Sequence, residues 1–436
     1  MKVGVKNYLF LILTVAFLPA VLFAQINWTE HTIAANYDRA HSVYAIDLDD
    51  DGDMDVLGAA NLADDITWWE NDGNENFTEH TIAANFEGAV CVYAIDLDDD
   101  GDIDVLGAAN GADDITWWEN DGSENFTEHT IAANYLWAVS VYATDLDDDG
   151  DVDVLGAAYD ADDITWWEND GSENFTEHTI AANFDGAYSV YAIDLDDDGD
   201  VDVLGAAYDA DDITWWENDG SENFTEHNIA ANFLGAIAVY AIDVDTDGDK
   251  DVVGAAYWGE DITWWENDGI ENFTEHPIAD NFWGAWYVYA IDVDNDTDVD
   301  ILGAASNADD ITWWENDGDE NFTEHTIAGE FDGAVSVFAI DVDGDTDIDV
   351  LGAGRDAYDI TWWESDLVGI EEETAEPVEV HDYGATIISG PLLLPEGKSY
   401  RIFDINGRMV EPHKIGTGIF FIESEGHIIQ KVVKVR

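Results

Sequence analysis

Residues 65–71 read Asp-Ile-Thr-Trp-Trp-Glu-Asn, and this stretch decides how the chain folds. Its core, Ile-Thr-Trp-Trp, begins at Ile66, Ile115, Ile164, Ile213, Ile262, Ile311 and Ile360. The interval is 49 residues each time, without an insertion or a deletion. A repeat of this length with several short strands in each unit is typical of a β-propeller, in which each repeat forms one blade.

Each repeat contains four candidate strands. In the first unit they cover residues 42–48, 54–59, 65–70 and 77–82. Asp-Gly pairs at Asp51-Gly52 and Asp72-Gly73 mark turns between them. The first two strands are apolar on both faces, as expected for a sheet that packs against a neighbouring sheet on each side.

The repeats do not begin and end in phase. The chain opens with residues 27–33 (NWTEHTI), which match the fourth strand of a unit, whereas the last unit stops after its third strand. Seven complete blades therefore exist only if the N-terminal strand completes the seventh. We predict an all-β, seven-bladed propeller over residues 25–366, closed by its N-terminal strand rather than left as an open solenoid.

The first 24 residues are predicted to be a secretory signal peptide. Lys2 and Lys6 give it a positive start, and residues 8–23 form an apolar run that is short for a membrane span. The alternative is an uncleaved anchor. Since no later segment is long and apolar enough to span a membrane, we expect an exported chain without a stable membrane span, secreted or held at the cell surface.

The C-terminal part differs in composition from the repeats. Residues 367–380 are acidic and contain Pro377, which predicts a linker, and residues 381–436 are predicted to form a small β-sandwich domain. Residues 399–410 (SYRIFDINGRMV), 416–421 (GTGIFF) and the basic C-terminus resemble the sorting domain of type IX secretion. That resemblance implies the secretion machinery as a partner. The alternative is an accessory β-domain without a sorting role.

The charge of the chain excludes whole classes of partner. It has 100 acidic and 12 basic residues, a net charge of −88, and between residues 25 and 366 the only basic residues are Arg39, Lys250 and Arg355. Nucleic-acid binding and simple attraction to anionic lipid both need a basic surface. The 19 Trp residues argue against disorder. Cys91 is the single cysteine, which excludes an internal disulfide framework and predicts a half-buried free thiol.

An Asp-rich loop lies between the first and second strands of every repeat. Its first copy places carboxylates at positions one, three, five and nine (Asp47, Asp49, Asp51 and Asp55), with Asp53 at position seven supplying a carbonyl. Such an oxygen-only set suits Ca²⁺. Solvated acidic turns are the alternative, but two carboxylates ~5 Å apart repel by ~3 kcal/mol at an effective dielectric constant of ~20, so a metal-free loop would be strained.

We therefore predict about seven calcium sites. The candidate residues are Asp47, Asp49, Asp51, Asp53 and Asp55; Asp96, Asp98, Asp100, Asp102 and Asp104; Asp145, Asp147, Asp149, Asp151 and Asp153; Asp194, Asp196, Asp198, Asp200 and Asp202; Asp243, Asp245, Asp247, Asp249 and Asp251; Asp292, Asp294, Asp296, Asp298 and Asp300; Asp341, Asp343, Asp345, Asp347 and Asp349. In the last two loops Thr297 and Thr346 replace the turn glycine, which predicts weaker or distorted sites.

The Asp loop, the following Gly58-Ala59-Ala60 and the Trp-Trp-Glu-Asn-Asp-Gly strand end together resemble the FG-GAP/VCBS repeat family, to which integrin α-subunit propellers belong. The resemblance covers residues 25–366. It implies calcium at loop positions one, three, five, seven and nine, and a role in adhesion or ligand binding. A fold by itself does not settle a function.

Comparison of the seven copies separates two faces of the predicted disc. The acidic-loop face carries the connections between strands one and two and between strands three and four, and it repeats almost unchanged. The variable face carries the connections between strands two and three and between successive blades. Loops on a rigid scaffold often bind ligands. The candidate ligand-binding residues on the variable face are Arg39, His41, Trp137, Tyr159, Tyr208, Tyr257, Trp258, Trp283, Trp286 and Arg355. The alternative is neutral drift in permissive loops.

Two other repeated features have structural interpretations. Adjacent residues of a strand point to opposite faces, so the Trp-Trp pairs are expected to pack between blades. The His of each Thr-Glu-His, as at His31 and His80, is expected to have a structural role on the outer strand. The chain shows no nucleophile elbow and no phosphate-binding glycine loop.

These observations favour a non-enzymatic, calcium-binding adhesion or ligand-binding module whose variable face meets a protein or a glycan. The alternatives are a carbohydrate-binding lectin, a secreted polysaccharide-acting enzyme and a structural surface-layer protein. Exposed aromatic side chains beside carboxylates suit either a sugar ring or a protein partner.

Overall fold

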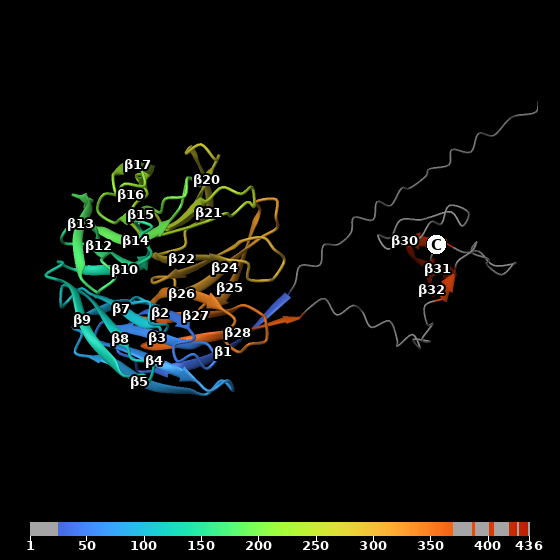
Figure 1. The fold of residues 1–436 in the computed structure, drawn as a ribbon, viewed down its shortest axis with the longest axis horizontal. Coiled ribbons are helices and arrows are strands. Elements are labelled where there is room, and N and C mark those ends of the chain that lie inside the picture. The colour runs from blue at the N-terminus through green and yellow to red at the C-terminus, as the bar shows by residue number, and fades with distance from the viewer. Residues whose placement is uncertain (1–24, 369–385, 389–400, 405–417, 425–426, 435–436) are drawn as a thin grey trace, which may run out of the picture. The chain divides into compact units, whose positions relative to one another are not determined.

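A computed structural model describes residues 25–368, 386–388, 401–404, 418–424 and 427–434 (Figure 1). Within these ranges all regular structure is β-strand. The chain divides into two compact units after Val368. The predicted signal peptide at residues 1–24 and most of the predicted linker lie outside the described residues. No helix in the described ranges is long and apolar enough to cross a membrane.

Each blade begins with an inner strand followed by a second strand. The inner strands are β2 (Ala40–Ile46), β6 (Ala89–Ile95), β10 (Ala138–Thr144), β14 (Ala187–Ile193), β18 (Ala236–Ile242), β22 (Ala285–Ile291) and β26 (Ala334–Ile340). The second strands are β3 (Asp55–Ala60), β7 (Asp104–Ala109), β11 (Asp153–Ala158), β15 (Asp202–Ala207), β19 (Asp251–Ala256), β23 (Asp300–Ala305) and β27 (Asp349–Gly354). Blades one to seven are numbered in this order.

The third strand of each blade carries the Trp-Trp pair, and the fourth is outermost. The third strands are β4 (Asp65–Asn71), β8 (Asp114–Asn120), β12 (Asp163–Asn169), β16 (Asp212–Asn218), β20 (Asp261–Asn267), β24 (Asp310–Asn316) and β28 (Asp359–Val368). The fourth strands are β5 (Phe77–Ala84), β9 (Phe126–Ala133), β13 (Phe175–Ala182), β17 (Phe224–Ala231), β21 (Phe273–Asp280), β25 (Phe322–Ala328) and, for blade seven, β1 (Gln25–Ala35).

The ring is closed by the two ends of the repeat region. Blade seven has the strand order β1-β28-β27-β26, and β1 pairs antiparallel with β28 from Gln25 opposite Val368 to Ala35 opposite Asp359. Figure 1 shows β1 and β28 side by side. The other six blades are four-stranded antiparallel sheets in sequence order, as in β2-β3-β4-β5. The structure confirms the predicted seven-bladed propeller and its N-terminal closing strand.

Burial follows the position of each strand in its blade. All six residues of every second strand are buried, because both faces of that strand pack on neighbouring blades. The inner strand alternates between buried and half-buried residues, since one of its faces borders the central channel. It ends at Ile46 rather than at the predicted residue 48, because Asp47 already belongs to the acidic loop.

The Trp-Trp pairs are packing residues, as predicted. Each of the 14 Trp side chains is at most 3% exposed. In blade one, Trp68 stacks on His80 with the ring centroids 4.7 Å apart, and His80 Nε2 lies 2.9 Å from Glu70 Oε2. Trp69 packs on the other side of the sheet, edge-on to Tyr37. The same His-Glu contact recurs in every blade, which supports the structural role expected for these His residues.

A ring of aromatic side chains crosses the central channel. One residue from each inner strand contributes to it, and neighbouring ring centroids are 4.8–5.2 Å apart around the complete circle. Its members are Tyr44, Tyr93, Tyr142, Tyr191, Tyr240, Tyr289 and Phe338. All seven side chains line a space in the channel that His41 and Trp286 also line.

The second unit contains one described sheet. Its order is β29 (Thr386–Ile388), β32 (His427–Lys434), β31 (Gly418–Ser424) and β30 (Arg401–Asp404), with β29 parallel to β32. The predicted β-sandwich and its sorting role partly rest on residues outside the described ranges and stay predictions.

Candidate functional site

The acidic loops of blades one to four each gather three of the predicted carboxylates, those at positions one, three and nine, whereas position five was expected in the group as well. In blade one, oxygens of Asp47, Asp49 and Asp55 lie within 4.8 Å of one another, and the equivalent groups recur in blades two to four. The loop is shaped by its own side chains. Asp47 accepts hydrogen bonds from the backbone N–H groups of Asp51 and Gly52, at 3.1 and 3.0 Å. Loop positions one, three and nine therefore converge on one point.

Position nine is the most buried carboxylate of each loop. Asp55 is fully buried, and its two oxygens accept backbone hydrogen bonds from Leu48 (3.0 Å) and Asn71 (2.8 Å). Burial raises the pKa of Asp55 to about 7 despite these hydrogen bonds, and the negative charges of Asp49 and Asp51 raise it further. The loop thus holds a carboxylate in a place where its charge is costly without a cation.

Several carboxylate oxygens of the loops are buried without a hydrogen-bond partner. Among the described residues, the buried Oδ1 atoms of four position-one aspartates have no hydrogen-bond partner; these are Asp96, Asp145, Asp194 and Asp243. In blade six the unpaired atom is Oδ1 of Asp294, at position three, whose pKa is raised to about 7, mainly by burial. A buried, unsatisfied carboxylate oxygen costs free energy, so the residues present fit a divalent cation bound by oxygen.

The remaining loop positions have different surroundings. Asp51, at position five, is exposed. The side chain of Asp53, at position seven, lies against the turn after the third strand, where a Cβ on Gly73 would be only 2.4 Å from Asp53 Oδ2. Asp53 therefore couples the two turns of the acidic-loop face, and its carbonyl stays the candidate ligand. Outside the loops, Glu217, His227 and Glu271 also lie within 4.8 Å of one another.

The two Thr-containing loops keep the turn at a conformational cost. Thr297 and Thr346 have φ values of 86° and 84°, in the left-handed region that Gly52 occupies at 99°. Their N–H groups still donate to position one, as Thr297 does to Asp292 at 2.9 Å. A β-branched residue at positive φ is strained, which is consistent with the predicted weakening of these two sites but does not test it.

On the variable face, two loops of each blade are joined by a hydrogen bond. In blade one, the N–H of Asn61 donates to the carbonyl of Arg39 at 3.0 Å. The inner strand begins there with a β-bulge, because the pairing shifts between Ala40 and Ser42. A bulge re-aims the extra side chain, here that of His41. The same bulge occurs in all seven inner strands.

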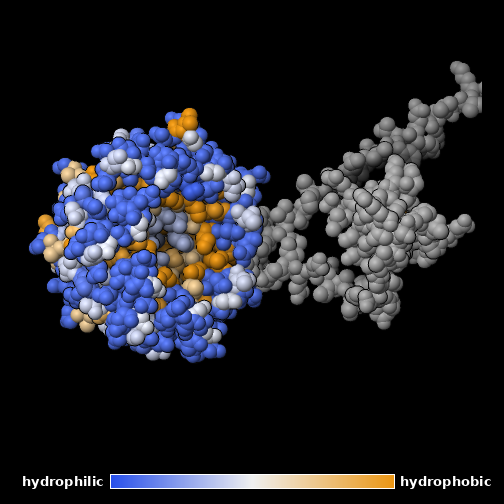
Figure 2. All heavy atoms as spheres, in the orientation of Figure 1, coloured by the Kyte–Doolittle hydropathy of each residue, from blue (hydrophilic) through white to orange (hydrophobic). Residues whose placement is uncertain are grey.

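These loops surround a depression of about 410 Å³ at the centre of the variable face. The residues that line it are Arg39, His41, Asn61, Asn110, Trp137, Tyr159, Tyr188, Tyr208, Ile237, Trp286 and Arg355. Figure 2 shows a largely hydrophilic surface that is hollowed near the middle of the propeller, with hydrophobic residues bordering the hollow. The volume lies within the range of about 300–1,000 Å³ typical of small-ligand sites.

Positive charge and aromatic rings meet in this depression. The Arg355 guanidinium lies over the ring of Trp286, 5.3 Å from its centroid, and its Nη2 is 3.1 Å from Asp356 Oδ2. The buried Nε of Arg355 has no hydrogen-bond partner among the described residues. Trp286 also packs edge-on against His41 at 5.9 Å.

His41 is held neutral. Burial lowers its pKa to about 4, and the positive charges of Arg355 and Arg39 lower it further, against the opposing hydrogen bond to Val90. Its Nδ1 lies 2.9 Å from the Val90 carbonyl oxygen. Because a carbonyl only accepts, Nδ1 carries the proton and Nε2 remains an acceptor.

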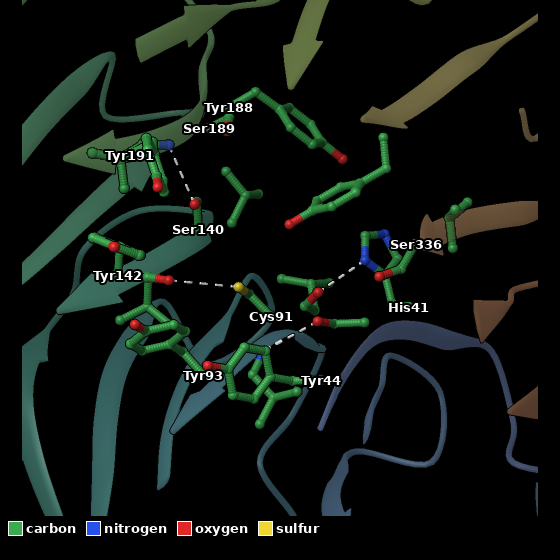
Figure 3. Close-up of a pocket in the computed structure, with 18 of the residues that line it drawn as sticks. His41, Tyr44, Cys91, Tyr93, Ser140, Tyr142, Tyr188, Ser189, Tyr191 and Ser336 are labelled. Atoms are coloured by element: carbon green, nitrogen blue, oxygen red, sulfur yellow. Dashed lines mark hydrogen bonds between the residues drawn. The ribbon is translucent and has the colours of Figure 1, made fainter. Parts of the chain in front are cut away.

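A chamber of about 150 Å³ lies inside the channel, and it shares His41, Tyr188 and Trp286 with the depression. Figure 3 shows its side chains around one space, including Ser140 and Cys91, whose Sγ contacts the Val141 carbonyl. Cys91 is a half-buried free thiol, as predicted, and burial raises its pKa to about 11.

The depression unites most of the predicted ligand-binding residues. Seven of the ten line it, and Tyr257 and Trp258 adjoin it through contacts with Trp286 and Tyr208 at 5.5 and 6.3 Å. Trp283 is 57% exposed and is not among the lining residues. Sequence reasoning missed Asn61, Asn110, Tyr188 and Ile237. Tyr188 had a signal: it occupies the bulge position of His41 and Trp286, where other copies have Val or Ile.

Comparisons with known proteins agree with this architecture. The model of the FG-GAP-like repeat family matches residues 47–107, 96–156, 145–205, 194–254, 243–303 and 292–352. No curated protein shows a significant match to the chain. Among solved structures, a streptogramin B lyase is similar at 16% identity, with 78% of this chain and 98% of that chain covered and a TM-score of 0.57. The WD40 β-propeller domain of Doa1 is similar at 13% identity, with 78% and 97% covered and the same TM-score. At such identities these two likenesses concern the fold alone.

Proposed function

Because this chain belongs to the FG-GAP-like repeat family, we propose that it is a calcium-stabilised, non-enzymatic binding module that captures its ligand in the depression on the variable face. One observation carries the proposal. The seven copies are nearly identical over most of their length, and four of the largest departures from the repeat, Arg39, Trp137, Trp286 and Arg355, come together in one depression.

Calcium is the proposed cofactor of the opposite face. The carboxylates of Asp47, Asp49 and Asp55 and the carbonyl of Asp53 would hold it in blade one, with equivalent residues in the other six blades. The bound ion would supply positive charge to oxygens that are buried and unpaired in the protein alone. Its role is to stabilise the scaffold that keeps the variable loops in place.

The proposed setting is outside the cell. The apolar N-terminal run, the single cysteine and the acidic surface fit a secreted or surface-held protein, and the C-terminal unit is proposed to engage type IX secretion machinery. Millimolar calcium, which loops of this kind need when their dissociation constants are ~10⁻⁴–10⁻³ M, is an extracellular condition.

The proposal is tested by ligand capture on two matched arrays, one of glycans and one of purified proteins, with about 2 mM calcium, which is above the dissociation constants of ~10⁻⁴–10⁻³ M. The key variant flattens the variable face by combining Arg39→Gly, Trp137→Gly and Trp286→Val. Each substitution installs the residue found at the same place in other blades. We expect capture by the native protein and its loss in the variant. Equal capture by both proteins would refute a role for the variable face.

An enzyme acting on a polysaccharide is the second candidate, and His41 favours it. Its imidazole is neutral and Nε2 is left as the proton-accepting nitrogen, although a pKa of about 4 makes it a weak base at neutral pH. Incubation with any captured glycan, followed by chromatography of the products, decides between the two. Shortened chains that disappear in His41→Val would establish catalysis, whereas an intact glycan would support a pure binding role.

A further inference from the structure

Two residues with strained backbone line the depression. Five of the seven copies have glycine at the position of Arg39, with φ values near 70°. The two copies without glycine have Arg39 and Trp137 there. Arg39 has φ 66° and Trp137 has φ 58°. Left-handed backbone is costly for bulky residues and recurs at functional sites. Both exceptions line the same depression.

The positive charge of the propeller is concentrated in the same place. Residues 25–366 carry 89 acidic and three basic side chains, and two of those three, Arg39 and Arg355, line the depression. Among the described residues Arg39 has no ion-pair partner, and Arg355 has one, Asp356. An arginine left without an ion pair in a domain so rich in carboxylates, beside a second arginine with a single partner, points to an anionic group from outside.

The aromatic residues form an arc across blades three to six. Trp137 and Tyr159 are 5.8 Å apart, Tyr159 and Tyr208 are 6.1 Å apart, and Tyr208 and Tyr257 are 6.1 Å apart, between ring centroids. Trp286 follows at 5.5 Å from Tyr257. The arginines belong to blades seven and one, so the depression has an aromatic side and a cationic side.

The polar groups between these sides are amides and hydroxyls. Asn61 Nδ2 lies 3.2 Å from Asn110 Oδ1, and the Tyr159 hydroxyl donates to Asp209 at 2.8 Å. Amides and hydroxyls keep further donors and acceptors after one hydrogen bond. Such groups match a ligand with many hydroxyls, and separate aromatic rings, of which Trp137 is 44% exposed, match the C–H faces of sugar rings.

We propose that the depression binds an acidic oligosaccharide, with sugar rings on the aromatic arc and a carboxylate or sulfate group on the side of Arg39 and Arg355. This inference rests on the binding function proposed above and specifies the class of its ligand. The acid group would supply the partner that Arg39 lacks among the described residues, because a guanidinium pairs with carboxylate and sulfate oxygens through two N–H groups at once.

The experiment is calorimetric titration of the full chain in calcium with four probes. They are an oligosaccharide containing glucuronic acid, its carboxyl-reduced neutral parent, a sulfated derivative of that parent and a Glu-rich peptide. We expect an acidic oligosaccharide to bind at least about tenfold more tightly than the neutral parent. The carboxylate and sulfate probes identify which acid group is preferred, and tighter binding of either supports the proposal.

Variants built from the repeats separate charge from fold. Arg39→Gly and Arg355→Asn each install the residue of other blades and should lower affinity for the acidic probe about tenfold, and by much more than for the neutral probe. Lys250→Val removes the third positive charge, on the acidic-loop face, and copies Val152 and Val201. It should change neither affinity.

Three outcomes would overturn the proposal. They are equal binding of the acidic and neutral probes, an effect of Lys250→Val as large as that of Arg39→Gly, and tighter binding of the Glu-rich peptide. None of them contradicts the broader binding function if Trp137→Gly still weakens binding. If no probe binds while the arrays show capture by the native protein alone, the acidic oligosaccharide is wrong and the binding function stands.

Discussion

The acidic-loop face and the variable face are the two ends of the same seven sheets, yet only the first repeats from blade to blade. Every blade presents Asp at loop positions one, three, five, seven and nine. At the other end the residue at the tip of the second strand is Asn61 in blade one, Tyr159 in blade three and Arg355 in blade seven. Repetition is what a stabilising element needs, and divergence is what recognition of one ligand needs.

The two faces also differ in which groups are energetically unfavourable in the protein alone. Several acidic loops hold buried oxygens without partners and carboxyls with raised pKa values, so the proposed calcium should stabilise them. The variable face has its unpaired group in Arg355 and its strain at Arg39 and Trp137. Calcium and ligand should therefore act on opposite ends of the propeller, one on folding and the other on binding.

The largest expected effect is the loss of stability on removal of calcium. Dissociation constants of ~10⁻⁴–10⁻³ M at millimolar calcium correspond to ~0.4–1.4 kcal/mol per site, or ~3–10 kcal/mol for seven sites. Chelation should lower the melting temperature by about 4–14 °C. Thermal melting followed by circular dichroism, with and without EDTA, measures this. An unchanged melting curve would contradict calcium binding by the acidic loops.

The calcium-free protein should respond to pH in an unusual direction. The position-nine carboxyls have folded-state pKa values of about 7, and about 8 in Asp300, against 3.8 for an ordinary Asp. A raised folded pKa contributes stability that is fully present below pH 3.8 and is lost as the pH rises through 7–8. In EDTA the protein should thus be more stable at pH 5 than at pH 8.5.

Urea unfolding at the two pH values measures this difference. With saturating calcium the order should reverse or vanish, because protons then compete with the ion for the same oxygens. Greater stability at pH 8.5 in EDTA would show that the buried carboxyls are not strained in the metal-free loops.

A smaller change in stability is expected in the two acidic loops that have threonine in place of the turn glycine. Thr297→Gly restores the glycine of the first five loops at φ 86° and should stabilise the calcium-bound protein by about 1 kcal/mol. Urea unfolding in calcium measures it, and Gly101→Thr in blade two is the matched reverse change, with an expected loss of similar size. A loss of stability in Thr297→Gly would show that the threonine side chain is itself useful.

The smallest change in stability is expected on the variable face, where a gain in stability should come with a loss of ligand binding. Arg39→Gly removes left-handed strain but frees the unfolded backbone, so a net gain of only about 0.5 kcal/mol is expected. The same variant should lose ligand affinity. A protein that becomes more stable while binding less well would show strain retained for function. Destabilisation together with unchanged binding would assign Arg39 to the scaffold instead.

Much of the fold could be predicted because the signal repeats. The 49-residue period, the orphan strand at residues 27–33 and the apolar second strands led to the closed seven-bladed ring that β1 and β28 complete. The packing role of the Trp pairs followed from strand alternation together with the expected burial of both faces of each blade. Strand bounds were less accurate, since an apolar Leu48 extends the pattern of the inner strand although Asp47 already begins the loop.

The candidate sites could be predicted only in part. Asp spacing indicates a cation loop, but it does not show that Asp55 is the buried member or that Asp53 turns toward Gly73. Those facts depend on how the third strand and its turn pack on the loop. Tyr188 was missed because a β-bulge re-aims it, and a bulge is a property of strand pairing rather than of one residue.

The sequence by itself determined the repeat, the acidic loops, the scarcity of positive charge and the N-terminal strand that completes the last blade. Each of these can be read from residue types and their spacing along the chain. Only the tertiary structure decided that Arg39, Trp137, Trp286 and Arg355 share one depression. Arg39 and Arg355 are 316 positions apart in the chain. They meet because closure of the ring turns a linear array of blades into a circle, whose inner strands all begin around one axis.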